Sequence, residues 1–270
     1  MVPYFEISTV ALGAWDLPIF RILLAAAGMI GVLAAWLLAP RLGWLKRDAA
    51  ILLGIATSCG FLGAHLASLV VYHPDRLAES PWQRLAEVFN GLSSIGGLLG
   101  GMAGAYLFAR LARRSALASL DVTALGAPFG WAVGRLGCFL VHDHPGIPSQ
   151  SFLAVQYPGG SRLDLGLLEM ALQGILALFL VTMTRRSRAP GSYIATYLFL
   201  YSLGRFGLDF WRAGGEEAAR AVRAGHLRAS SLDPRWGPFT AAQYACLGII
   251  VVVVGLVAIQ RRTQAGRKAL

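Results

Sequence analysis

Long apolar runs separated by short polar connections dominate this 270-residue chain. Seven of these runs come close to the roughly 20 residues that a helix needs to cross about 30 Å of hydrocarbon. They cover residues 17–39, 49–72, 90–110, 117–141, 164–184, 191–211 and 239–260. The run at 117–141 is the least regular, because Asp121, Pro128 and Arg135 interrupt it. This pattern predicts an all-α integral membrane protein with about seven transmembrane helices.

The composition points to the same class, since 56% of the residues are hydrophobic and only 14% are charged. A soluble domain carries about 25% charged residues. We expect one domain, residues 1–270, with external loops at about 142–163 and 212–238. The first loop is rich in turn-forming residues. The second contains a mixed Glu/Ala/Arg stretch at 216–228, which suits either an amphipathic helix on anionic head groups or a solvated loop helix.

The net charge of +10 raises the question of a nucleic-acid partner. The positive residues are, however, distributed unequally between alternate connections. The connections at 41–47, 110–114, 185–188 and 261–268 hold 13 Lys and Arg residues, and the other set holds 8. Because cytoplasmic connections of membrane proteins are enriched in Lys and Arg, this asymmetry predicts the N-terminus outside and the C-terminus inside. The charge is mainly a topology signal, and we expect no nucleic-acid partner.

Two arginines, Arg135 and Arg205, lie inside the apolar runs and away from their polar flanks, and each must face protein, water or a ligand. A guanidinium at the centre of a membrane helix costs about 2.5–3.5 kcal/mol on insertion scales. Arg205 lies four residues from both Tyr201 and Asp209, so these three residues share one helix face. Together with Arg135, this arrangement suits a lipid phosphate. The structural alternative is a set of internal ion pairs, Arg205 with Asp209 and Arg135 with Glu169.

The clearest source of proton chemistry is the triplet His142-Asp143-His144. A histidine titrates near neutral pH, and a neighbouring carboxylate can orient it and stabilise its charged form. A metal site would need a third ligand, and adjacent side chains often point apart. The three cysteines have no metal-like spacing and are expected to be buried free thiols. We therefore expect no metal and no cofactor.

Four ordered motifs carry a resemblance to a known family. Residues 134–139 resemble a Gly-Arg-x-Gly-Asn-Phe signature that ends in a glycine, Gly146 in this chain. Residues 167–171 resemble a Gln-Leu-Tyr-Glu-Ala segment, 201–209 a Tyr-x-x-x-Arg-Phe-x-x-Glu helix, and 94–98 a Phe-His-Gly-Gly segment. With its seven spans, the chain is similar over most of its length to the prolipoprotein diacylglyceryl transferases, bacterial inner-membrane enzymes that begin lipoprotein maturation.

This resemblance implies transfer of the diacylglyceryl group of phosphatidylglycerol to the cysteine thiol of a lipobox, with release of glycerol phosphate. The implied partners are phosphatidylglycerol, a lipobox-containing prolipoprotein and other lipids of the bacterial plasma (inner) membrane. The residues that the resemblance assigns to lipid or phosphate binding are Arg135, Arg205, Gly146, Glu169 and Asp209. It also places Tyr201 at the lipid head group, where Tyr201 and Arg205 would act in catalysis.

The chain departs from the family pattern at the residues that are expected to activate the acceptor thiol. Ile95 stands at the position of the family's catalytic histidine, and Cys138 replaces an asparagine. We hypothesise that His142 or His144, assisted by Asp143, supplies the missing base.

Three other functions remain as alternatives. The first is a family member that binds phospholipid or lipoprotein precursor without catalysis, and the second is a lipid transferase with another acceptor. A transporter is disfavoured, because the polar groups gather toward the outer ends of the spans, whereas transport sites usually lie near the midplane.

Overall fold

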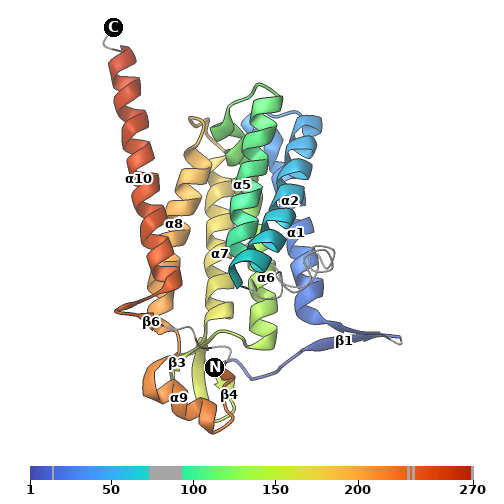
Figure 1. Ribbon diagram of the computed structural model, residues 1–270, viewed down its shortest axis with the longest axis vertical. Coiled ribbons are helices and arrows are strands. Elements are labelled where there is room, and N and C mark those ends of the chain that lie inside the picture. The colour runs from blue at the N-terminus through green and yellow to red at the C-terminus, as the bar shows by residue number, and fades with distance from the viewer. Residues whose placement is uncertain (14, 73–92, 230–231, 233–234, 269–270) are drawn as a thin grey trace. The chain divides into compact units, whose positions relative to one another are not determined.

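The computed structural model describes residues 1–268 except 14, 73–92, 230–231 and 233–234. Seven long helices lie in these residues (Figure 1): α1 (Ile19–Leu38), α2 (Lys46–Ala67), α5 (Ser94–Leu111), α6 (Ala116–Val141), α7 (Leu165–Met183), α8 (Ser192–Leu208) and α10 (Ala241–Lys268). Each helix falls on one of the seven apolar runs of the sequence. The predicted helical class is therefore confirmed, with short strands added before α1 and in the connections.

Five of the described helices are long and apolar enough to cross a membrane: Ile19–Leu42, Lys46–Val70, Ala116–Val141, Leu165–Met183 and Ala241–Ile259. The first of these includes a 3-10 turn, η1 (Ala39–Leu42), and the second runs into a π-helical turn, η2 (Ser68–Tyr72). Helices α5 and α8 are shorter, with 18 and 17 residues. The chain is a multi-pass membrane protein.

Two compact units can be distinguished in the chain. The first comprises Met1–Ile30, Pro128–Leu180 and Ala195–Leu270, and it contains every candidate lipid-binding and catalytic residue from Arg135 to Asp209. The second comprises Gly31–Ala127 and Val181–Ile194.

In the second unit, α2 and α5 run side by side and meet through glycines (Figure 1). A Cβ atom built on Gly63 would lie 2.6 Å from the carbonyl oxygen of Gly96, and one on Gly104 would lie 2.8 Å from Cβ of Cys59. A side chain at either glycine would push the helices apart. Small residues of this kind allow the close van der Waals packing that holds membrane helices together.

Asp121, the acidic residue inside α6, has a structural role in the second unit. Its carboxylate accepts hydrogen bonds from the N–H groups of Gly191 at 2.6 Å and of Tyr193 and Ile194 at 2.9 Å. These N–H groups belong to the start of α8, where a helix leaves its first donors without an internal partner. The helix dipole favours a negative charge at the same place. Asp121 interrupts an apolar run because it caps the start of another helix.

In the first unit, the two predicted loops form regular structure at one end (Figure 1). The first loop contains the antiparallel strands β3 (Pro145–Pro148), β4 (Val155–Tyr157) and β5 (Gly160–Asp164), in the order β3-β5-β4. The second contains α9 (Gly215–Arg223). Two hairpins complete the unit: β1 (Thr9–Leu12) with β2 (Trp15–Pro18), and β6 (Arg235–Trp236) with β7 (Phe239–Thr240).

A small hydrophobic core joins this sheet to the helices of the first unit. Its buried members come from α6, β4, α9 and the connection before α9, and include Phe139, Val155, Tyr157, Ala213, Ala218 and Ala221. The helix α9 thus overlaps the first part of the predicted amphipathic stretch at 216–228 and ends at Arg223. The alanine face of α9 is buried against protein.

Candidate functional site

Helix α6 ends in a turn that folds the next residues back onto the helix. His142 has a φ angle of 49°, the left-handed conformation in which many helices place a glycine after their last turn. The N–H of His142 donates to the carbonyl of Phe139 at 3.2 Å, and the N–H of Asp143 donates to that of Cys138 at 3.3 Å. This pair of hydrogen bonds is a Schellman motif, and it brings Asp143 beside Cys138.

The side chain of His142 is held on both ring nitrogens. Nδ1 lies 2.8 Å from Oδ2 of Asp164, and Nε2 lies 3.0 Å from the carbonyl oxygen of Phe5. The ring stacks on Tyr4 with 4.4 Å between centroids and is almost fully buried. His142 therefore bonds Asp164 and not Asp143, the partner expected from the sequence. These contacts offset the cost of a left-handed, non-glycine residue.

Asp164 also accepts a hydrogen bond from the hydroxyl of Tyr157 at 2.6 Å. Burial, followed by the charge of Asp164, raises the pKa of Tyr157, so this hydroxyl stays protonated and remains a donor. Asp164 Oδ1 accepts from the N–H of Leu167 at 3.0 Å, which caps the start of α7. This buried network fixes the sheet to α6 and α7.

His144, the second histidine of the triplet, is the one whose side chain meets Asp143. Its Nδ1 lies 2.9 Å from Oδ1 of Asp143, and both side chains are partly exposed, at 23% and 37%. Cys138 joins them, because one ligand atom from each of Cys138, Asp143 and His144 lies within 4.8 Å of the other two. The Schellman turn thus brings a third side chain of a metal-binding type next to the pair, which the sequence alone did not identify.

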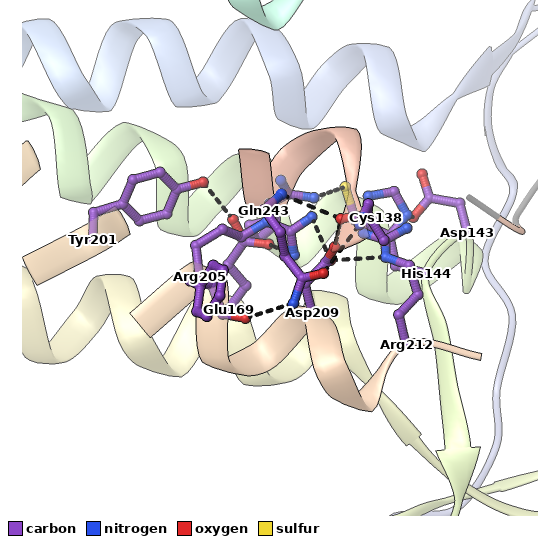
Figure 2. Close-up of polar contacts among 12 residues, drawn as sticks. Cys138, Asp143, His144, Glu169, Tyr201, Arg205, Asp209, Arg212 and Gln243 are labelled. Atoms are coloured by element: carbon purple, nitrogen blue, oxygen red, sulfur yellow. Dashed lines mark hydrogen bonds and ion pairs between the residues drawn. The ribbon is translucent and has the colours of Figure 1, made fainter. Parts of the chain in front are cut away.

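Glu169 on α7 is the centre of a second polar network (Figure 2). Its carboxylate is fully buried and contacts the guanidinium groups of Arg135 and Arg205, each at 3.1 Å. The hydroxyl of Tyr201 donates to Oε1 at 2.8 Å, and the indole N–H of Trp131 donates to the same oxygen at 3.3 Å. A buried charge is tolerated only when it is paired and hydrogen-bonded, and Glu169 meets this condition with groups from α6 and α8.

Asp209 extends this network beyond the end of α8. It begins a 3-10 turn, η3 (Asp209–Trp211), and its Oδ1 lies 3.1 Å from Nη2 of Arg205 and 3.0 Å from Nε of Arg212. The hydroxyl of Thr240 donates to its other oxygen. The predicted Arg205–Asp209 pair is therefore present, and it forms part of a larger arrangement.

Thr240 and Gln243 hold the start of α10 against this network. The N–H of Gln243 donates to Oγ1 of Thr240 at 3.2 Å, and the N–H of Thr240 donates to Oε1 of Gln243 at 3.0 Å. Nε2 of Gln243 donates to the carbonyl of Phe206 at 3.1 Å, which ties α10 to α8. We did not anticipate this contact from the sequence, although Thr-x-x-Gln before an apolar run is the signal of a capping box.

The two arginines keep hydrogen-bonding capacity beyond their carboxylate partners. A guanidinium offers five N–H donors. Nε of Arg135 faces Glu169 and its Nη1 lies 3.6 Å from Sγ of Cys138. Its Nη2 has no partner among the described residues, and the side chain is 14% exposed. Nη1 of Arg205 is buried beside Glu169 without the alignment of a hydrogen bond. Such donors suit the oxygens of a phosphate.

Gly146 is placed where a side chain does not fit. It lies on β3 and forms a bridge with Arg212, and its carbonyl accepts from Nη1 of Arg162 at 3.1 Å. A Cβ atom on Gly146 would lie 2.8 Å from the carbonyl oxygens of both Leu163 and Trp211. The glycine therefore permits the backbone contact that joins β3 to η3, next to Asp209.

The structure brings most of the predicted site residues together within the first unit. Figure 2 shows Asp143, His144 and Cys138 at one end of the polar network and Tyr201 at the other. His142 belongs instead to the buried network of Asp164. Ile95 lies on α5, and its side chain falls outside the described residues.

The fold and this network define a multi-pass membrane protein with an arginine-rich polar site at the ends of α6 and α8 and the start of α7. The model of the family described as prolipoprotein diacylglyceryl transferase matches residues 8–259 of the chain. The chain belongs to this family.

Individual relatives carry the name phosphatidylglycerol–prolipoprotein diacylglyceryl transferase. The one from Chromohalobacter salexigens is 32% identical over 193 residues, which cover 68% of this chain and 72% of that protein. The one from Pseudomonas paraeruginosa is 28% identical over 268 residues, covering 95% and 94%. The one from Clostridioides difficile is 27% identical over 198 residues, covering 72% and 78%.

Proposed function

We propose that this protein transfers the diacylglyceryl group of phosphatidylglycerol to the cysteine thiol of a lipobox-containing prolipoprotein in a bacterial plasma membrane. The observation that carries the proposal is the pair Arg135 and Arg205, which share the buried carboxylate of Glu169 at 3.1 Å each. Membrane interiors rarely hold several charged groups without a functional reason. Family membership supports the same reaction and the same two substrates.

The arginine pair forms the phosphate half of the proposed site. In the transfer, the carbon–oxygen bond between the diacylglyceryl group and the phosphate breaks, and glycerol phosphate leaves with the electron pair. Arginine donors that are already oriented by Glu169 and Asp209 would stabilise the charge that develops on this leaving group. Tyr201 would support the head group from the same side. The network is buried, so little water screens these interactions.

The thiol half of the proposed site is the cluster of Cys138, Asp143 and His144. The acceptor thiol must lose its proton, because the thiolate is the nucleophile. His144, paired with Asp143 at 2.9 Å, is the histidine of this site whose ring is partly exposed, at 23%. We assign the proton-accepting role to this cluster, and we leave His142 as a residue that holds the fold.

A second candidate function is binding of phospholipid or lipoprotein precursor without transfer. Ile95, at the position of the family's catalytic histidine, favours it. A transferase with a different acceptor would keep the phosphate half of the site and lose the lipobox specificity.

An assay with labelled phosphatidylglycerol and a lipobox peptide tests the proposal on the purified full-length protein. We expect a thioether-linked diacylglyceryl peptide, and we expect Arg135→Ala and Arg205→Ala to lose it. Arg223→Ala, on the exposed side of α9, is the control for removal of a positive charge. Unchanged transfer in both site variants would contradict the phosphate assignment. Binding of phosphatidylglycerol without any adduct would favour the second candidate.

A further inference from the structure

The end of α6 gathers three side chains of the types that can bind a divalent metal ion such as Zn²⁺. Sγ of Cys138, a carboxylate oxygen of Asp143 and a ring nitrogen of His144 lie within 4.8 Å of one another. Thiolate, imidazole and carboxylate are the usual protein ligands of Zn²⁺. Structural zinc sites have four protein ligands, whereas catalytic sites have three and an open position. The cluster corresponds to the second kind.

The backbone holds these ligands in place from both sides. The N–H of Asp143 donates to the carbonyl of Cys138 at 3.3 Å, and the carbonyl of His144 accepts from the N–H of Leu165 at 2.9 Å. The ligands are therefore anchored to the end of α6 and the start of α7. In a tetrahedral zinc site, ligand atoms lie about 3.5 Å apart. The two ligand atoms that lie farthest apart, within 4.8 Å, have to approach each other by about 1 Å. The ring of His144 and the carboxylate of Asp143 are partly exposed, so these side chains have room to rotate.

The atoms of Asp143 and His144 meet in a way that suits a shared cation. Oδ1 and Nδ1 approach to 2.9 Å, are shielded from solvent, and lack the alignment of a hydrogen bond with each other or with any described group. Both atoms carry lone pairs, and a metal ion bound to both would satisfy them once the pair opens from 2.9 Å toward the tetrahedral spacing. A Cys138 thiolate and the Asp143 carboxylate would neutralise the two charges of Zn²⁺. The metal ion with these two ligands would then carry no net charge, so it would not repel the neighbouring guanidinium of Arg135.

We infer that Cys138, Asp143 and His144 bind Zn²⁺ and that the metal's open position receives the acceptor thiol. This inference rests on the proposed function and changes one part of it, because His144 becomes a metal ligand and no longer accepts the proton of the thiol. A thiol that coordinates a metal ion is deprotonated, so it becomes a nucleophile without a histidine at Ile95. Its proton passes to solvent. The sulfur then bonds to the diacylglyceryl carbon as the carbon–oxygen bond breaks, and glycerol phosphate leaves beside Arg135.

The competing explanation is that Cys138 is itself the nucleophile, with His144 as its base and Asp143 as the group that orients the base. Attack by Cys138 on the lipid would leave a thioether on the enzyme. A thioether is a poor substrate for a second displacement, so this enzyme would modify itself once and stop. The metal explanation permits repeated turnover.

Metal binding is measured first, independently of transfer. The full-length protein in detergent is stripped with a chelator and titrated with Co²⁺, whose thiolate charge-transfer absorption reports a cysteine ligand, and then with Zn²⁺ in competition. We expect the absorption in the wild type and its loss in Cys138→Ser. Cys246→Ser is the matched control, because Cys246 is 5% exposed and Cys138 is 7% exposed. Asp143→Asn and His144→Gln, at partly exposed positions, should bind Zn²⁺ at least about 10-fold more weakly.

Transfer to the lipobox peptide is then measured on the same samples. Loss of transfer after chelation and its return with Zn²⁺ would support the inference. Transfer by protein that binds neither Co²⁺ nor Zn²⁺ would overturn the metal site and leave the proposed function intact. Metal binding without transfer of any label would keep the site but overturn its role in thiol activation, together with the proposed function. A diacylglyceryl group found on Cys138 would overturn the inference in favour of the self-modifying cysteine.

Discussion

Tyr201 donates its hydroxyl hydrogen to the carboxylate of Glu169 at 2.8 Å, and the two residues come from different helices of the first unit. Tyr197 stacks on Tyr201 with 6.0 Å between ring centroids, and its hydroxyl donates to the neutral amide oxygen of Gln173 at 3.2 Å. The two tyrosines are thus neighbours of the same size. They differ in their partners: Tyr201 bonds the charged carboxylate of Glu169, which pairs with both arginines, and Tyr197 bonds the neutral amide of Gln173.

The pair gives a matched test of the network. Hydrogen bonds to charged groups contribute about 1.5–3 kcal/mol, and those between neutral groups about 0.5–1.5 kcal/mol. We expect Tyr201→Phe to lower kcat/KM for diacylglyceryl transfer about 10- to 100-fold, because Glu169 would no longer be held for both arginines. Tyr197→Phe should lower it less than about 10-fold. An equal fall in kcat/KM in both variants would show that the hydrogen bond to the charge of Glu169 matters no more than the one to Gln173.

Glu169 should matter for folding as well as for transfer. Glu169→Gln would leave the guanidinium groups of Arg135 and Arg205 facing a neutral amide in a buried site. Removal of one partner from a buried ion pair costs about 3–5 kcal/mol. We expect a clearly lower thermal unfolding temperature in detergent and loss of transfer. Glu216→Gln, on the exposed side of α9, is the control and should leave both measurements nearly unchanged.

The two histidines of the triplet should separate in a stability measurement. His142→Ala would remove one of three hydrogen-bond partners of Asp164 and the stacking on Tyr4. A hydrogen bond to a charged group contributes about 1.5–3 kcal/mol. His144→Ala removes a partly exposed ring and should change the free energy of unfolding by no more than about 0.5 kcal/mol. We expect transfer to show the reverse order once the His142 variant is assayed below its unfolding temperature. An active His144→Ala protein would contradict the assignment of the thiol half.

The sequence predicted the helices well, because a membrane leaves few alternatives. A chain in hydrocarbon must satisfy its backbone hydrogen bonds internally, so each long apolar run becomes a helix. The spacing of Tyr201, Arg205 and Asp209 likewise predicted one polar face, and both structural ion pairs that we considered are present. The Arg205–Asp209 contact depends on a spacing of four residues along the chain, and the Arg135–Glu169 contact on single charges inside apolar runs.

The partners of the histidines depend on longer connections. Asp164 is 22 residues from His142 and reaches it only because β5 pairs with β3 and delivers the chain to α7. Cys138 meets Asp143 because His142 adopts a left-handed conformation that is uncommon for a non-glycine residue. Neither event has a signal in the pattern of apolar and polar residues. The contact of Asp209 with Thr240 similarly required knowing where α10 begins.

Gly146 provides a steric test of how β3 supports the site. Gly146→Ala would place a Cβ atom 2.8 Å from the carbonyl oxygens of Leu163 and Trp211, both of which are backbone atoms that cannot rotate away. Overpacking of this kind costs about 1–3 kcal/mol. Because the displaced segment carries Asp209 and Arg212, we expect weaker binding of phosphatidylglycerol as well as lower stability.

The matched control for Gly146→Ala is Gly174→Ala on α7. A Cβ atom there meets nothing within 4 Å, and alanine is favoured over glycine inside a helix by about 1 kcal/mol. This variant should be as stable as the wild type or more so, with unchanged lipid binding. Binding of labelled phosphatidylglycerol and thermal unfolding in detergent measure the two effects separately. A Gly146→Ala protein that unfolds earlier but binds lipid normally would limit β3 to a structural role and separate it from the arginines.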